Sequence, residues 1–238
     1  IIAEDNDAQE TKNFLANYKS NFPIKHFNQE DKRNRKAIII NKSLPNTTGE
    51  YIIFIDGDTI PYSTFIESHV KLSETKTILC GRRVNMGDKV SKDLRDEKIT
   101  AYEIEKSFFK KYPYLTNDNI RHYEQGIRFN PTSFLYRFLN KENKNLHILG
   151  SNFSCFREDI FKINGFDEDI IGGSKDDVDL EWRFIMSGCK LKSCKYCANL
   201  FHLNHSRNLR LNDELLAKEQ MKLNKLNQKF ICKNGIIK

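Results

Sequence analysis

The sequence predicts an α/β fold with a mostly parallel central sheet flanked by helices, and three observations favour it. Strand-sized apolar runs alternate along the chain with segments of helical pattern, as in folds built from repeated β-α units. The run Tyr51–Ile55 is apolar on both faces, which suits a strand at the centre of such a sheet. It ends in Asp56-Gly57-Asp58, and ligands of open α/β sheets collect at the carboxyl ends of the strands.

The other elements follow in order. Besides the central run, strands are expected at Ile1–Ala3, Ile24–Phe27, Thr77–Val84 and Leu191–Phe201. Helices are expected at Asp7–Tyr18, from Pro61 to about Ser73, at Ile99–Lys111 and at Asn212–Phe230, while Ala37–Thr48 is a helix or a loop. Proline favours the first turn of a helix, which is the reason for beginning one at Pro61. From Leu149 to Arg183 the pattern reads strand, helix, glycine stop, loop and helix.

We expect a single domain over residues 1–238, because no repeat or low-complexity linker divides the chain. Within it, residues 90–146 are charged and rich in Tyr and Phe, which indicates a helical, aromatic-rich insertion. Residues 208–232 carry apolar side chains at helical spacing and predict a C-terminal helix packed on the domain, with a membrane-surface or dimer helix as the alternative.

Charge and length limit the classes of function. No apolar stretch approaches the ~20 residues that a membrane-spanning helix needs. The net charge of +7 indicates an anionic partner, such as nucleic acid, an acidic bilayer surface or a sugar nucleotide. Basic residues are dispersed apart from residues 31–36, and no nucleic-acid motif accompanies them, so we interpret them as a solvated face and expect no nucleic-acid partner.

Six scattered cysteines do not resemble the dense framework of a small secreted domain and favour a reducing cytoplasm. Cys194-x-x-Cys197 could be half a zinc site or a redox pair, but no second pair with ligand spacing follows, so buried thiols are the favoured interpretation. The chain opens in mid-strand at Ile1, without a signal peptide or an initiating Met, which indicates a fragment.

Three groups of residues carry chemistry. Asp56 and Asp58 present hard oxygens that suit a divalent cation, although a strand followed by an Asx-type turn would look the same. His202 and His205 follow another predicted strand and can supply an imidazole ligand to the same cation. Five carboxylates within Asp167–Asp177 form an acidic loop that could host a general base, or else cap the following helix.

Several ordered motifs carry a resemblance to a known family. They are Ala3-Glu4-Asp5-Asn6, Asp56-Gly57-Asp58, Gly81-Arg82-Arg83-Val84, Gly150–Ser154, Asn164–Glu168, Asp176–Leu180 with Arg183, His202–His205 and Cys232–Gly235. With them the chain resembles a bacterial glycosyltransferase of family 2, which has the GT-A, Rossmann-like fold of nucleotide-diphospho-sugar transferases. Its C-terminal half is similar to the galactosyltransferase C-terminal region.

The resemblance implies a set of roles. Asp56 and Asp58 would hold Mn²⁺ or Mg²⁺ with His205 as a third ligand and His202 as the alternative, and the cation would bridge the diphosphate of a UDP-sugar. Asp177 would be the general base and Asp176 would orient the acceptor. Donor contacts would come from Asp5, on the uracil ring, and from Arg83 and Asn152.

The expected function is a metal-dependent inverting transfer of a hexose or N-acetylhexosamine to a hydroxyl of a cell-surface glycan, such as lipopolysaccharide or capsule, or of a lipid-linked acceptor. The enzyme would be cytoplasmic, at the inner face of the plasma membrane, where its basic surface could make a peripheral contact. The alternatives are another metal-dependent nucleotidyl or phosphoryl transferase, and an inactive module that binds sugar nucleotides.

The chain departs from the family pattern in two places. The family's first strand and helix are missing before Ile1. The family's G-W-G-x-E-D loop is Gly172-Gly173-Ser174-Lys175-Asp176-Asp177, so Gly173 stands where the family has a Trp that stacks on sugar, and Asp176 stands for its Glu. These changes motivate the inactive-module alternative.

Overall fold

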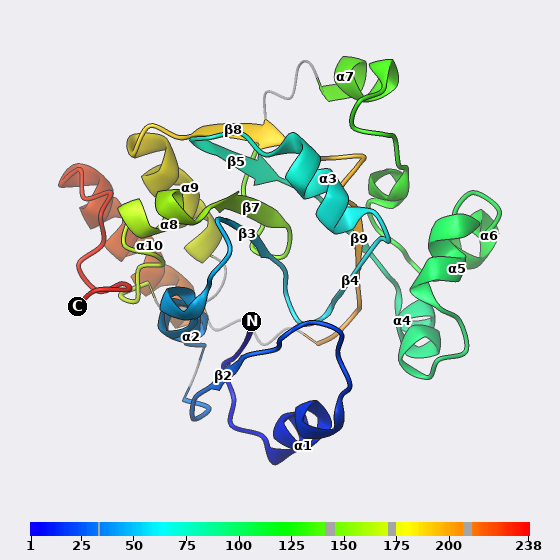
Figure 1. Cartoon of the computed structure of the whole chain (residues 1–238), viewed down its shortest axis with the longest axis horizontal. Coiled ribbons are helices and arrows are strands. Elements are labelled where there is room, and N and C mark those ends of the chain that lie inside the picture. Colours follow the sequence, from blue (N-terminus) through cyan, green and yellow to red (C-terminus); the bar gives the residue numbers. More distant parts are fainter. Residues whose placement is uncertain (33, 141–145, 171–174, 207–210) are drawn as a thin grey trace. The chain divides into compact units, whose positions relative to one another are not determined.

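The computed structural model describes residues 1–32, 34–140, 146–170, 175–206 and 211–238, and Figure 1 traces the elements. Contacts between residues divide the chain into two compact units. The first comprises Ile1–Glu50, Glu158–Ser187 and Arg210–Lys238, and the second comprises Tyr51–Arg157 and Gly188–Leu209. The chain therefore leaves the first unit after Glu50, returns to it and leaves again, so that both units contain segments that are distant in sequence.

The main sheet of the second unit has four strands in the order β3-β7-β5-β8. These are β3 (Tyr51–Phe54), β7 (Phe153–Phe156), β5 (Thr77–Cys80) and β8 (Lys190–Ser193). Only β5 and β8 run parallel, while β7 lies antiparallel to both β3 and β5. The prediction of a mostly parallel sheet was wrong. Residues 81–152 separate β5 from β7 in sequence, and a connection of this length can return the chain in either direction.

A second sheet of this unit has the order β4-β9-β6, with β4 (Thr59–Pro61), β9 (Leu200–His202) and β6 (Val84–Asn85). Pro61 ends the edge strand β4, where its missing N–H is tolerated, and helix α3 (Phe65–Leu72) begins four residues later. The helix start predicted at Pro61 was therefore wrong. The predicted strands Thr77–Val84 and Leu191–Phe201 are each divided between the two sheets, as β5 with β6 and as β8 with β9.

The helical part of the second unit lies between β6 and β7 in sequence and shares an apolar core with β6 and β9. Its helices are α4 (Asp88–Arg95), α5 (Ala101–Lys106), α6 (Tyr112–Thr116) and α7 (Phe134–Asn140), with the 3₁₀ turn η2 (Tyr123–Gly126). Helix α5 begins with a capping box in which Thr100 and Glu103 bond each other's backbone N–H. Phe108 stacks on Tyr123 with ring centroids 4.4 Å apart. The aromatic residues thus build part of this core, and the predicted helix Ile99–Lys111 ends early, at Lys106.

In the first unit, β1 (Ile2–Glu4) and β2 (His26–Asn28) form a parallel pair that contacts helix α2 (Lys36–Ser43). The remaining elements are α1 (Gln9–Asn17), η1 (Leu44–Asn46), α8 (Arg157–Lys162), α9 (Asp176–Met186) and α10 (Leu211–Leu226). After α8 the chain takes the left-handed conformation at Asn164 and Gly165, with φ of 63° and 76°. This is the glycine stop that the sequence predicted, since glycine adopts positive φ without steric cost.

All six cysteines are buried thiols, as the sequence predicted. Burial raises the pKa of Cys197 to about 11, and the Cys197 thiol donates to the carbonyl oxygen of Cys194 at 3.1 Å. Such a thiol stays protonated at neutral pH and makes a poor metal ligand or nucleophile.

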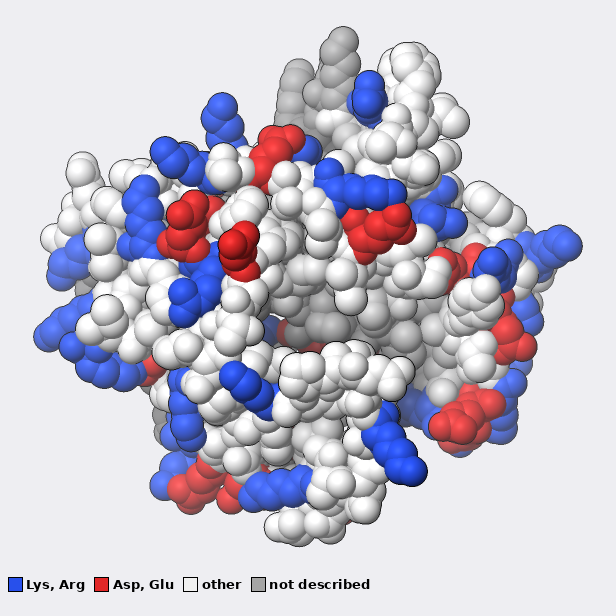
Figure 2. All heavy atoms as spheres, in the orientation of Figure 1, with Lys and Arg blue, Asp and Glu red and all other residues white. Residues whose placement is uncertain are grey.

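Two surface properties bear on location. Among the helices in the described ranges, none combines the length and the apolar character needed to cross a membrane. On the face shown in Figure 2, Lys and Arg are spread among acidic residues and do not form one continuous patch. On this face the basic side chains are therefore dispersed, as the sequence predicted.

Candidate metal centre and active site

The pairing of β4 with β9 brings together one carboxylate and two imidazoles. The two strands run antiparallel with Thr59 opposite His202, and the backbone N–H of Leu203 donates to the carbonyl oxygen of Asp58 at 2.9 Å. Asp58, just before β4, therefore lies beside His202 at the end of β9 and His205 three residues later. The register of the β4–β9 pair therefore brings Asp58 to His202, 144 residues later in the sequence.

The three side chains form a compact cluster. The Nε2 atoms of His205 and His202 lie 2.8 Å and 3.3 Å from Oδ2 of Asp58, and one potential ligand atom from each residue falls within 4.8 Å of the others. His202 is buried, whereas His205 is exposed. Burial alone would raise the pKa of Asp58, but the hydrogen bond of His202 and the charges of both histidines outweigh it, so this pKa lies below its ordinary value.

The hydrogen bonds of the cluster fit a bound cation. Nδ1 of His205 lies 2.8 Å from the carbonyl oxygen of Ser206, and because a carbonyl only accepts, Nδ1 carries the proton. In neutral His205 the lone pair of Nε2 then faces the carboxylate of Asp58, an arrangement that a cation between them satisfies. In addition, Oδ1 of Asp58 is buried and has no hydrogen-bond partner among the described residues. This donor set of one carboxylate and two imidazoles can hold a first-row divalent metal ion.

Asp56 lies outside this cluster of three. Its carbonyl oxygen accepts from both the backbone N–H and the hydroxyl of Thr59, which closes the turn from β3 into β4. A Cβ added to Gly57 would have no heavy atom within 4 Å, so the side of the turn at Gly57 is open. The turn therefore leaves room for a ligand beside Asp58.

Two predicted donor contacts belong to the same unit. Asn152 is completely buried, and its amide nitrogen donates to the carbonyl oxygens of Arg82 and Ala198 at 2.8 Å and 2.9 Å. Its Oδ1 lies 3.2 Å from Nε2 of His69, so the whole amide of Asn152 is engaged within the protein. Arg83 is half-buried and donates to the hydroxyl of Ser151 at 3.0 Å. In the structure Asn152 has a packing role, and its part in donor binding stays a prediction.

Asp5 and Asp176 belong to the first unit, and each interacts with a residue at the N-terminus of α2. The carboxylate of Asp5 accepts from the backbone N–H of Arg35, the residue before α2, and from the amide of Gln29. Burial raises the pKa of Asp176, and the charge of Lys36, the first residue of α2, opposes that rise. The sequence predicted a solvated basic run at residues 31–36 and did not indicate that Lys36 acts on Asp176. Nothing in the charge pattern alone distinguishes Lys36 from its neighbours.

Asp176 and Asp177 open helix α9, where the helix dipole favours negative charge. Asp177 is half-buried, whereas Asp176 is buried and its Oδ1 has no hydrogen-bond partner among the described residues. Burial raises the pKa of Asp176 to about 7, with the neighbouring charges of Asp177 and Asp179 acting in the same direction and those of Lys36 and Arg183 opposing it. Gly173, which stands where the resemblance expects a Trp, lies outside the described residues.

Asp179 and Arg183 anchor α9 one turn further on. Both are buried, and Nε of Arg183 lies 2.5 Å from Oδ2 of Asp179. The guanidinium of Arg183 also donates to the carbonyl oxygens of Ile163 and Gly165, at the end of α8. The pair therefore fixes the helix that carries Asp176 and Asp177. The sequence reading matched these two residues to the family without assigning this role, which their i, i+4 spacing could have indicated.

Replacing Arg183 by Met is expected to lower the free energy of unfolding by about 3–5 kcal/mol, because Asp179 is left buried and unpaired. Urea denaturation measures this change. The matched control is Lys229→Met, which removes an exposed cation from the same unit and should change stability by less than about 0.5 kcal/mol. Removing both charges in Arg183→Met with Asp179→Leu should recover much of the loss. Equal stability of Arg183→Met and the control would contradict the anchoring role.

Asp176 should make stability depend on pH. The pKa of Asp176 is about 7 in the folded chain, whereas its ordinary value is 3.8. Between pH 3.8 and about 7, the folded state therefore holds a proton on Asp176 that the unfolded state has released. The free energy of unfolding should therefore fall as pH rises from about 4 to about 7, by up to about 4 kcal/mol from this group.

Asp176→Asn removes that contribution, so the variant should gain stability relative to the wild type as pH rises through this window. Urea unfolding at about pH 4 and about pH 8 checks it. Asp31→Asn, which changes an exposed carboxylate of the same unit, is the matched control. A constant difference between Asp176→Asn and the wild type over this range would contradict the raised pKa.

Comparisons with known protein families identify the family to which the chain belongs. Together, the α/β architecture and the cluster of one carboxylate and two imidazoles place the chain among α/β proteins whose side chains could hold a divalent cation. A family model described as "Glycosyl transferase family 2" matches residues 1–162, and a model described as "N-terminal domain of galactosyltransferase" matches residues 134–206. The chain belongs to glycosyltransferase family 2. This confirms the resemblance, and with it the GT-A fold and a transferase activity class.

The second match covers the part of the chain that carries His202 and Asp176–Leu180. No curated protein matches the chain closely enough to add a relative to this comparison. Enzymes of the family commonly use a divalent metal and a nucleotide sugar, and act on a sugar donor and an acceptor.

Proposed function

We propose that the chain is a metal-dependent inverting glycosyltransferase that moves a hexose or N-acetylhexosamine from a UDP-sugar to an acceptor hydroxyl. The observation that carries the proposal is the cluster of Asp58, His202 and His205, in a chain that belongs to glycosyltransferase family 2. The galactosyltransferase match over residues 134–206 favours a galactose-type donor.

Asp58, His205 and His202 would hold Mn²⁺ or Mg²⁺, with Asp56 close enough in sequence to contribute an oxygen from the same turn. When bound, the cation neutralises the charge that develops on the departing diphosphate. Asp58 suits this role because its lowered pKa keeps it ionised, and its buried Oδ1 still has an acceptor site to fill. The open side of Gly57 would leave space for the diphosphate.

The chemical step follows from the carboxylates of α9. The acceptor oxygen forms a bond to the anomeric carbon as the bond from that carbon to UDP breaks, and Asp177 takes the hydroxyl proton. Attack from the face opposite to UDP inverts the anomeric configuration. Asp176, buried beside it, would orient the acceptor, and Asp5 would accept from the uracil ring. Arg83 and Asn152 would shape the donor pocket.

The proposed setting is the biosynthesis of a cell-surface glycan, such as lipopolysaccharide or capsule, with both units acting as one GT-A domain in the cytoplasm. The acceptor would be the growing glycan or its lipid-linked precursor, presented at the inner face of the plasma membrane. The net charge of +7 supports a peripheral contact with that face.

A panel of UDP-sugars tests the proposal, with UDP release measured in Mn²⁺ and in EDTA, and with the product configuration read by NMR. Metal-dependent release of UDP from one donor, with inversion, is the expected result. Release of pyrophosphate or of a sugar phosphate would instead indicate a nucleotidyl or phosphoryl transferase. UDP binding without release from any donor, in this chain and in one extended at its N-terminus, would indicate an inactive module.

A further inference from the structure

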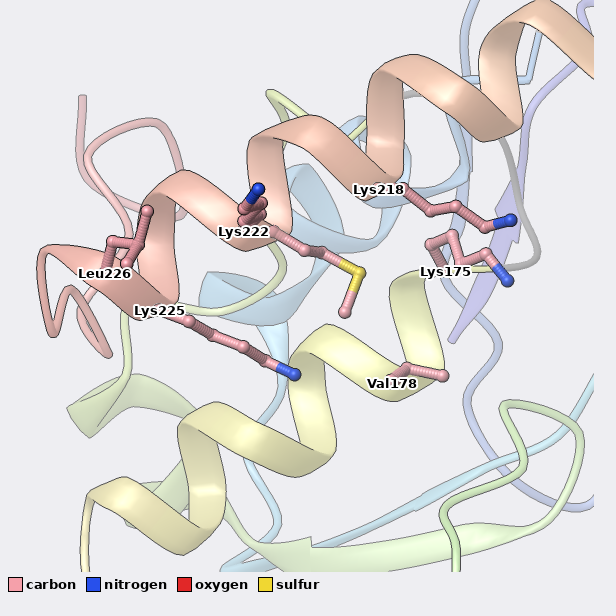
Figure 3. A pocket seen from close by; sticks show the side chains of 7 residues that line it. Lys175, Val178, Lys218, Lys222, Lys225 and Leu226 are labelled. Carbon is pink, nitrogen blue, oxygen red and sulfur yellow. The ribbon is translucent and has the colours of Figure 1, made fainter.

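A pocket of about 510 Å³ lies between α9 and α10 in the first unit, and none of the residues that line it was assigned above to the donor or the metal. Four lysines line it, namely Lys175, Lys218, Lys222 and Lys225. Its apolar lining comes from Val178, Met221 and Leu226, and no Asp or Glu contributes to it. Figure 3 shows the side chains of Lys175 and Lys218 extending toward the same end of the pocket.

The ammonium groups of these four lysines form no ion pair within the described part of the chain. Lys218, Lys222 and Lys225 follow the i, i+4, i+7 spacing of a single helix face. Like charges so close together repel one another, and an anion bound among them would relieve that repulsion.

Helix α10 also exposes apolar side chains beside the lysines. One face is fixed to the unit: Ala217 and Met221 pack on Ile170, and the amide of Asn224 donates to the buried carboxylate of Asp167 at 2.8 Å. On the rest of the helix, four leucines each expose more than half of their surface, namely Leu215, Leu216, Leu223 and Leu226. Exposed leucines next to a lysine row are typical of helices that lie on an anionic bilayer surface.

We infer that this pocket and the adjoining face of α10 dock on a bilayer of acidic phospholipid. The lysines would bind the headgroup phosphates, while Leu226 and its exposed neighbours enter the boundary between headgroups and acyl chains. A soluble anion would use the lysines but would leave the leucines in water, so the combination favours a lipid surface. The inference depends on the packing of α9 and α10 and not on the transferase reaction.

Sedimentation with vesicles of phosphatidylcholine, with or without phosphatidylglycerol, tests the inference in the absence of any sugar donor. The chain should bind only the acidic vesicles, and binding should weaken as salt is added. Changing Lys175, Lys218, Lys222 and Lys225 to Gln should reduce the partition coefficient at least about a hundred-fold, since each lysine near an acidic surface contributes several-fold. The matched control changes four exposed lysines outside the pocket to Gln, namely Lys19, Lys106, Lys110 and Lys190.

A spectroscopic variant reports on insertion of the leucines. Trp182 is the only tryptophan, so Trp182→Phe with Leu226→Trp places one indole on α10. Its emission should shift to the blue with acidic vesicles and stay unchanged with inositol hexakisphosphate. Equal loss of binding in the two sets of lysine variants would overturn the inference, as would lysine-dependent binding of inositol hexakisphosphate without binding to vesicles. Because no donor is present, an inactive transferase could still dock, so the two proposals fail separately.

Discussion

Asp58→Asn is expected to lower the rate of UDP release by about 10³-fold or more. Asp58 is the residue that both histidines contact, with Nε2 of His205 at 2.8 Å and Nε2 of His202 at 3.3 Å. The asparagine retains the size of the side chain but loses the charge that a divalent cation needs. The measurement is the rate of UDP release at saturating Mn²⁺ with the donor that the panel identifies.

The control for Asp58 is Asp96→Asn, which changes a carboxylate on the same unit that is paired with Lys92 and Lys98. It should leave the rate within a factor of about two, as expected of a surface substitution. His205→Ala should fall between these variants because His205 is one of two imidazoles in the cluster. Equal rates for Asp58→Asn and Asp96→Asn would remove Asp58 from the reaction.

Asp177→Asn is expected to lower kcat by about 10²- to 10⁴-fold while leaving the affinity for UDP and Mn²⁺ unchanged, because it removes only the proton acceptor. Asp177 lies in the first turn of α9, and the buried pair of Asp179 with Arg183 holds that helix in place. Transfer to the acceptor gives kcat, and calorimetric titration with UDP and Mn²⁺ gives the affinities.

Asp31→Asn, an exposed position in the same unit, serves as the control for Asp177. If Asp177→Asn lost affinity for UDP in proportion to its activity, Asp177 would be a binding residue and not the base. If Asp176→Asn abolished transfer while Asp177→Asn retained it, the base would be Asp176, whose pKa of about 7 also suits proton transfer near neutral pH.

Residues at strand ends were the part of the site that sequence could locate. An apolar run that stops at Asp56-Gly57-Asp58, and a second that stops at His202, each mark where a strand gives way to a loop. The structure brings Asp58 to both histidines through the β4–β9 ladder. Sequence could not show that Asp56 would stand outside this cluster, because that depends on how the turn closes on Thr59.

Strand direction was the part of the fold that sequence did not determine. The run Tyr51–Ile55 was expected at the centre of the sheet, but β3 is only half-buried and lies at the edge of the described sheet, where it pairs with β7. An apolar strand can pair in either direction, and the choice between them depends on long-range connections. The division of Leu191–Phe201 between two sheets is likewise set by tertiary pairing, with the chain turning at Tyr196 in the left-handed conformation.

The roles of buried polar groups also lay beyond the sequence. Asn152 belongs to a motif of the family, yet its amide is engaged by Arg82, Ala198 and His69. Burial lowers the pKa of His69 to about 4, so this histidine is neutral and part of the core network. A motif match cannot distinguish a residue that touches a ligand from one that holds the surrounding backbone.

Binding of Mn²⁺ in the presence and absence of UDP, followed by electron paramagnetic resonance, tests the central claim most directly. The proposal predicts one Mn²⁺ site that tightens when UDP is added, by the same factor by which Mn²⁺ tightens UDP, since the coupling is reciprocal. Asp58→Asn should abolish both effects, and Asp96→Asn should preserve them. Mn²⁺ affinity that is unaffected by UDP, or that persists in Asp58→Asn, would contradict a metal-dependent transferase centred on Asp58, His202 and His205.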